Sequence, residues 1–173
     1  VLYDAVLKST PAAPAVMGLC RALNIALGMH AAGSLWTAAA MTPIGLVWLY
    51  VASITFFARH EAGVSSSLRL AAGTIGVCAA VAGLSALTWI VPLAQVSFLW
   101  PVGLFLVGLG YKGFRAATQR SPEKVQAAVK TFVISLILFD ACIAWAARGH
   151  LAALLVASLI LPTFLLARIL RVT

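Results

Sequence analysis

Long apolar runs constrain this chain more than any other feature. Stretches of about 18 or more mostly apolar residues recur along the sequence, and a helix needs about 20 such residues to cross a bilayer. Hydrophobic residues make up 63% of the chain and charged residues only 9%, unlike the composition of a soluble domain. The period-two alternation of outer-membrane strands is absent. The sequence therefore predicts one all-α membrane domain over residues 1–173, a polytopic transmembrane helical bundle.

About six full spans are expected, together with the end of an earlier one. They cover residues 12–34, 43–58, 68–88, 96–111, 124–147 and 150–170. The expected breaks are Met41-Thr42-Pro43, RHEAGVSSS from Arg59, Val91-Pro92 and the basic segment from Lys112 to Lys124. Within the last, Ser121, Pro122 and Glu123 are typical of an N-cap, an N1 proline and an acidic first turn. Residues 1–8 read like the tail of a span and begin with Val, so we expect N-terminal helices that are missing from this sequence.

The basic residues are distributed unequally between the two sides of the expected bundle. One side holds Lys8, Arg59, Arg69, Lys112, Arg115, Arg120, Lys124, Arg168 and Arg171, and the other holds only Arg148. Because cytoplasmic loops carry such an excess of Lys and Arg, we expect the basic loops to be cytoplasmic. The net charge of +8 then reflects topology. Nucleic acid is not an expected partner, since no basic surface with interleaved aromatic residues lies outside the membrane.

Polar residues within the first full span are the first candidates for a binding site. Arg21, Asn24 and Gly28 share one helix face by their spacing. A lipid-facing Arg would cost about 2.5–3.5 kcal/mol or more. Arg21 therefore either extends to the nearby membrane surface, with Asn24 joining helices, or faces a cytoplasm-facing cavity. In such a cavity its planar fork of donors would suit phosphate oxygens.

Other polar groups lie close to that cavity or within a span. Tyr3 and Lys8 are expected at the cytoplasmic end of the preceding span, and Lys binds phosphate as a point charge. Glu61 follows on the next cytoplasmic loop, where a divalent ion could bridge it to phosphate; a solvated loop explains it equally well. Asp140 lies in the middle of a span, where it is either a transporter-type functional carboxylate or a hydrogen-bonded structural acid.

These residues resemble the UbiA superfamily of intramembrane prenyltransferases, most closely the UbiA-like branch of ebo-type gene clusters. The resemblance rests on YDAVLKST at residues 3–10, similar to the family pattern Y-x-x-x-L-K-x-T, on Gly18 with RALNIALG, and on TFFARHEAG. SPEKVQAAVKTFVISLILFDA and the closing LPTFLLARIL also resemble that branch. The resemblance covers essentially all 173 residues, but only the C-terminal part of the family fold.

The resemblance implies transfer of a prenyl group from an isoprenyl diphosphate to an aromatic or lipid-like acceptor, in a bacterial inner membrane. By the resemblance, Lys8 contacts the diphosphate, Tyr3 lines the acceptor or prenyl site, and Arg21 and Asn24 face the central cavity. Together with the residues singled out above, the expected site binds diphosphate through Lys8, Arg21, Asn24 and Arg59, has a substrate cavity lined by Tyr3 and Gly28, and holds the Mg²⁺ that the resemblance implies through Glu61. The chain departs from the family where Thr55 and the triplet Arg-His-Glu replace paired aspartates, and the first aspartate-rich motif is missing. This chain alone is therefore expected to be inactive. The alternative is a non-catalytic UbiA-like membrane carrier or assembly subunit.

Overall fold

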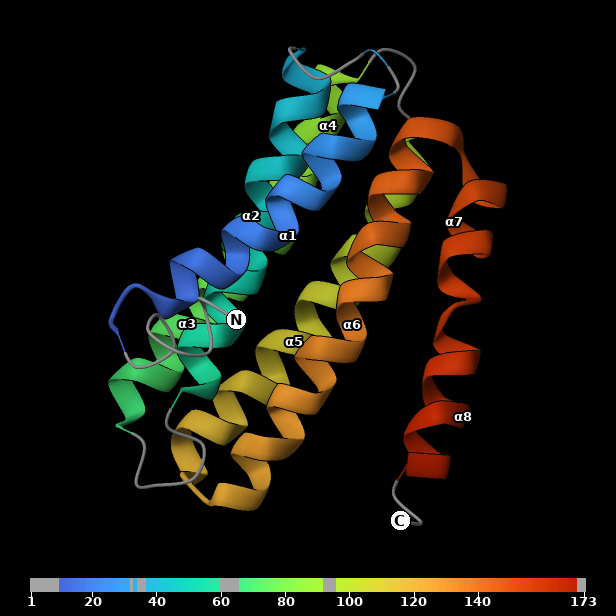
Figure 1. The fold of residues 1–173 in the computed structure, drawn as a ribbon. Coiled ribbons are helices and arrows are strands. Elements are labelled where there is room, and N and C mark those ends of the chain that lie inside the picture. Colours follow the sequence, from blue (N-terminus) through green and yellow to red (C-terminus); the bar gives the residue numbers. More distant parts are fainter. Residues whose placement is uncertain (1–9, 32, 34–36, 60–65, 92–95, 171–173) are drawn as a thin grey trace.

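The computed structural model describes residues 10–31, 33, 37–59, 66–91 and 96–170, with side chains up to residue 166 (Figure 1). These residues form α1 (Ala13–Ala31), α2 (Ala38–Ala58), α3 (Ser67–Gly83), α4 (Leu87–Ile90), α5 (Leu99–Gln119), α6 (Pro122–Arg148), α7 (His150–Ala157) and α8 (Ile160–Leu170). Short 3-10 helices occupy Leu84–Ala86 and Val96–Phe98. No strand occurs in these ranges, so the all-α prediction is confirmed.

Four helical stretches are long and apolar enough to cross a membrane. They are Ala38–Ala58, Ser67–Ile90, Val96–Gln119 and Pro122–Arg148. The chain is therefore a membrane protein with transmembrane helices. Of the two other expected spans, the first corresponds to α1, whose 19 residues would extend about 28 Å. The last is a shorter apolar stretch, His150–Leu166, which is divided after Ala157, where α7 ends with Ser158 as its C-cap residue.

The predicted break at Met41-Thr42-Pro43 is wrong. Helix α2 begins at Ala38, and Pro43 lies inside it. The start is determined by Thr37, an extended N-cap residue whose Oγ1 accepts a hydrogen bond from the Ala40 N–H at 3.2 Å. Pro43 deprives the helix of one backbone donor, but the helix continues to Ala58.

The basic segment after residue 111 is helical, where a loop was expected. Helix α5 continues through Lys112 and Arg115 and ends with Arg120, whose φ of 48° is left-handed and whose N–H donates to the Ala116 carbonyl. Helix α6 begins at the predicted position: Ser121 is its N-cap residue, with an extended backbone, and Pro122 is its first residue. The Ser121 side chain makes no capping hydrogen bond.

The helices pack in the order of the chain. Helix α1 packs against α2, α2 against α3, α3 against α5, α5 against α6, and α6 against α7, while α2 also touches α6. Figure 1 shows successive long helices running in alternating directions, with α7 and α8 outermost beside α6. Aromatic side chains fill the core, and its largest fully buried residues include Tyr50, Phe57, Phe98, Phe132 and Phe139.

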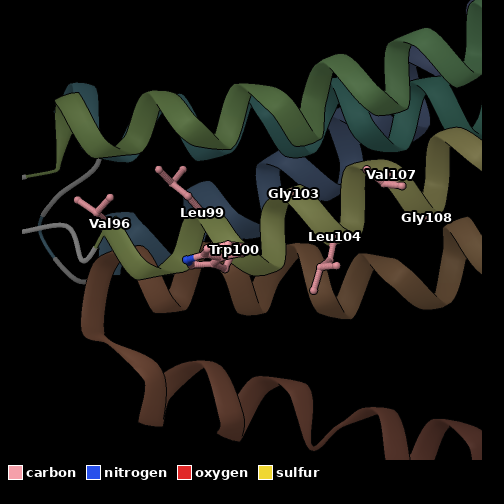
Figure 2. A pocket seen from close by; sticks show the side chains of 7 residues that line it. All are labelled: Val96, Leu99, Trp100, Gly103, Leu104, Val107 and Gly108. Atoms are coloured by element: carbon pink, nitrogen blue, oxygen red, sulfur yellow. The ribbon is translucent and has the colours of Figure 1, made fainter.

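The outer surface is apolar. Trp89 is 91% exposed and Trp100 81%, and these two tryptophans belong to the end of the bundle that holds α4 and the start of α5 (Figure 1). Figure 2 shows Trp100 with Val96, Leu104 and Val107 along an outward apolar hollow of α5. Exposure of this kind suits contact with lipid, and tryptophans near helix ends are typical of the membrane interface.

Because successive helices run in alternating directions (Figure 1), most of the basic residues lie at the same end of the bundle, which we call the basic end. It holds, among the described residues, Arg59 after α2, Arg69 in the first turn of α3, Lys112, Arg115 and Arg120 in or after the last part of α5, and Lys124 in the first turn of α6. Arg148, the last residue of α6, lies at the opposite end. Among the described residues, the predicted separation of charge is therefore present in the fold, while Lys8 and Arg171 lie outside them.

Candidate functional site: an ion pair inside the bundle

An ion pair joins α1 to α6. The Arg21 Nη2 donates a hydrogen bond to Asp140 Oδ2 at 2.7 Å, across 119 positions of sequence. It is the one ion pair found within the described part of the chain. The Arg21 side chain is 41% exposed and that of Asp140 25%. The pair thus joins two helices that pack mainly against other neighbours, and both side chains stay partly exposed.

The pair lies far from the helix ends. Arg21 and Asp140 each lie about two turns or more from either end of their helices. The guanidinium is directed to a carboxylate on another helix, and the Arg21 side chain remains partly exposed. Each partner removes the cost of leaving the other as an isolated charge in the bilayer.

One donor of Arg21 is left over. Its Nε is buried and has no hydrogen-bond acceptor among the described residues. A buried donor without a partner costs about 1–3 kcal/mol, and an oxygen atom of a ligand would remove that cost. The Nε itself has almost no accessible surface, so a ligand that binds while Asp140 holds Nη2 would meet the exposed part of the guanidinium.

A second polar contact lies nearby on α6. The Tyr50 hydroxyl and Ser135 Oγ are 2.7 Å apart, and Tyr50 also donates to the Phe132 carbonyl at 3.2 Å. The Tyr50 ring packs on Phe139 with centroids 4.7 Å apart. These contacts join α2 to the part of α6 between Phe132 and Phe139, within about two turns of Asp140. Sequence reasoning missed them because Tyr50 and Ser135 carry no charge that marks them within an apolar run.

The other residues predicted to bind diphosphate or to line its cavity do not lie together in the structure. Asn24 and Gly28 lie on α1 beyond Arg21, and both are exposed. Arg59 lies at the basic end, where its Nη2 donates to the Thr10 carbonyl at 2.6 Å, about two turns or more from the level of Arg21 along α1. The structure does not bring Arg59 into the Arg21–Asp140 contact. Tyr3, Lys8 and Glu61 lie outside the described residues.

The described residues do not supply a magnesium site. Nowhere in the ranges given above do three or more His, Cys, Asp or Glu side chains cluster as metal ligands. Asp140, the acid nearest the candidate site, already accepts from Arg21, whereas Mg²⁺ prefers several oxygen ligands in octahedral geometry. Fold and site together define a polytopic α-helical membrane protein with an ion pair inside its bundle. Searches of protein-family models, curated proteins and solved structures find no match to the chain.

Proposed function

We propose that this chain is part of a membrane-embedded prenyltransferase of the UbiA type. Such an enzyme would transfer a prenyl group from an isoprenyl diphosphate to an aromatic or related acceptor. One observation carries the proposal: Arg21, about two turns or more from either end of α1, is held by Asp140 of α6, and its side chain is still 41% exposed, so a ligand can reach part of the guanidinium. The N–H donors of the exposed part of the guanidinium suit a phosphate oxygen of the leaving group.

The chemistry assigned to this chain is electrostatic. In prenyl transfer the allylic C–O bond breaks, the diphosphate leaves with the electron pair, and the carbocation bonds to the acceptor. A guanidinium that faces the leaving group offsets the charge that develops on it, and apolar walls shield the cation from water. We assign no step to Mg²⁺, because the described residues offer no ligand set for it.

The membrane orientation belongs to the same proposal. We assign the basic end to the cytoplasm of a bacterial plasma membrane, because Lys and Arg accumulate in cytoplasmic loops. A diphosphate substrate would then approach from the compartment that the basic end faces. The outward apolar hollows on α5 are compatible with substrates that reach the protein through the bilayer.

Paired variants test the role of Arg21. Arg21→Leu alone leaves Asp140 without its partner, so loss of function would be ambiguous. In Arg21→Leu/Asp140→Leu both charges are absent and side-chain volume is roughly kept, and we expect a folded protein that no longer binds radiolabelled farnesyl diphosphate. Arg148→Gln, at the far end of α6, is the control for loss of a positive charge. Normal binding by the double variant would make the pair purely structural and would remove the support for the enzyme.

One observation favours a carrier as the second candidate. An intramembrane carboxylate is a functional candidate by default, and Asp140 is only part-buried, so a proton or a cationic cargo would compete with Arg21 for it. Reconstituted vesicles separate the two classes. Transfer of a labelled prenyl group to an acceptor supports the enzyme, whereas Asp140-dependent uptake without transfer supports the carrier.

A further inference from the structure

Three hollows along helices α5 and α6 adjoin one another. The first, of about 250 Å³, is lined by apolar parts of α5, α6 and α7. The second, of about 410 Å³, shares Pro101, Phe105 and Leu138 with the first. The third, of about 240 Å³, shares Lys112 with the second. We call these three hollows together the α5–α6 groove.

The groove changes from apolar to basic along its length. Its middle is lined by Leu104, Phe105, Leu109 and Leu138. Figure 2 shows Leu104 beside Gly108 on the outward face of α5, and both residues also line the second hollow. At the basic end the third hollow is lined instead by Tyr111, Lys112 and Arg115 of α5 and by Lys124 of α6.

The three cations of this basic mouth have no acidic partner in the described part of the chain. Lys112 Nζ donates to Thr131 Oγ1 at 2.9 Å, and Lys124 Nζ donates to the Gln119 side chain. These partners are neutral. Glu123, the acid beside Lys124 in sequence, does not line the hollow. Lys112, Arg115 and Lys124 therefore concentrate positive charge at the basic end of the groove, and no acidic side chain of the described residues pairs with it.

Space for an apolar chain is provided by Gly108. A Cβ atom at Gly108 would meet no atom within 4 Å. On the same helix, a Cβ at Gly113 would lie 3.0 Å from the Thr74 Cβ, with other Thr74 atoms closer. Gly113 therefore serves the contact with α3, whereas the missing side chain at Gly108 leaves the groove open.

We propose that the α5–α6 groove binds an anionic phospholipid. Its phosphate lies among Lys112, Arg115 and Lys124, and one acyl chain follows the apolar middle past Gly108. Arg supplies a planar fork of donors and Lys a point charge for phosphate, and basic pockets between membrane helices bind acidic headgroups. Membrane lipids are expected partners of a helical bundle of this kind. The groove makes one lipid a specific ligand, at a place apart from the Arg21–Asp140 site.

Native mass spectrometry of the full chain in detergent tests the proposal. The probes are phosphatidylglycerol and phosphatidylcholine with identical acyl chains. We expect retention of phosphatidylglycerol over phosphatidylcholine, and Arg115→Gln should weaken phosphatidylglycerol binding about fivefold, as loss of one interfacial cation predicts. Lys130→Gln is the matched control, because Lys130 is exposed on α6 and lines none of the hollows. It should leave binding unchanged.

A second variant tests the apolar part of the groove. Gly108→Leu fills open space and improves helix propensity, so it should fold normally and still weaken phosphatidylglycerol binding. Equal retention of the two lipids, or equal effects of Arg115→Gln and Lys130→Gln, would overturn the proposal. Displacement of phosphatidylglycerol by equimolar inorganic phosphate would overturn it in favour of a free-phosphate site. Preferential displacement by farnesyl diphosphate would overturn it in favour of a substrate site.

Discussion

Arg21 is the residue on which most of the functional inference depends. Its guanidinium makes the ion pair with Asp140 and retains an unpartnered buried donor among the described residues. Asp140 and Arg21 were each singled out from sequence as charges inside a membrane, but nothing in one sequence relates two positions that lie 119 residues apart. A search for opposite charges inside different spans would have found this pair, since an isolated charge there is costly.

Removal of one partner should destabilise the protein more than removal of both. Arg21→Leu leaves a carboxylate in the bundle without its cation, and the cost of breaking a buried pair in this way is about 3–5 kcal/mol. The partial exposure of both side chains places the expected loss at or below the lower end of that range. Arg21→Leu/Asp140→Leu should recover most of it. Thermal unfolding in detergent measures the cycle, and additive losses would show that the two side chains do not interact.

At the scale of helices, close approach depends on small residues at particular positions. Gly18 is buried on α1, and a Cβ there would lie 2.6 Å from the Trp48 backbone oxygen. The Trp48 indole N–H in turn donates to the Ala15 carbonyl at 3.1 Å. Gly18 thus allows α1 and α2 to pack closely.

Gly18→Ala should weaken the contact between α1 and α2. The added methyl group meets a backbone oxygen that cannot rotate away, so we expect a loss of about 1–3 kcal/mol. Gly28→Ala on the same helix is the matched control, because nothing lies within 4 Å of its Cβ position. It should be neutral or slightly stabilising, since Ala favours a helix by about 1 kcal/mol over Gly. Unfolding curves of the two variants that coincide would contradict the packing assignment.

The end of α5 carries backbone strain. Arg120 has a φ of 48°, a left-handed conformation that costs a residue with a Cβ about 1–2 kcal/mol. Arg120→Gly should therefore raise the unfolding free energy by about 1 kcal/mol relative to Arg120→Ala. Both variants lose the same charge, so the difference between them isolates the backbone. Equal stability of the two would show that the turn relaxes at no cost.

The helix boundaries show what pattern reading could and could not predict. The apolar runs predicted the membrane helices because burial in lipid needs length and hydrophobicity, and both are local properties. They did not predict that α2 begins before Pro43 or that α5 continues through Lys112 and Arg115. A helix can pass beyond the apolar region when its basic side chains are exposed, as these are. The apolar run of α5 ends before these basic residues, but its backbone hydrogen bonds continue to the end of the helix.

For the whole molecule, charge and helix direction agree in defining two ends. The basic end holds most of the described Lys and Arg residues, and Arg148 lies at the other end. In a background without Cys20, Cys78 and Cys142, single cysteines at Leu68 and Thr118 should react with a membrane-impermeant reagent from the same side of oriented vesicles. A cysteine at position 148 should react only from the opposite side. Labelling of Leu68 and Thr118 variants from different faces would break the topology.

The long sequence separation within the ion pair also imposes an order of events on synthesis. Each helix packs chiefly on the one made just before it, so most of the bundle can assemble as it emerges. Arg21 cannot, because its partner is made 119 residues later, which is on the order of ten seconds at ordinary rates of translation. During that interval Arg21 lacks the partner that it has in the folded chain. The contact between Arg21 and Asp140 can therefore form only after α6 has been made, later than the packing of α1 on α2 could begin.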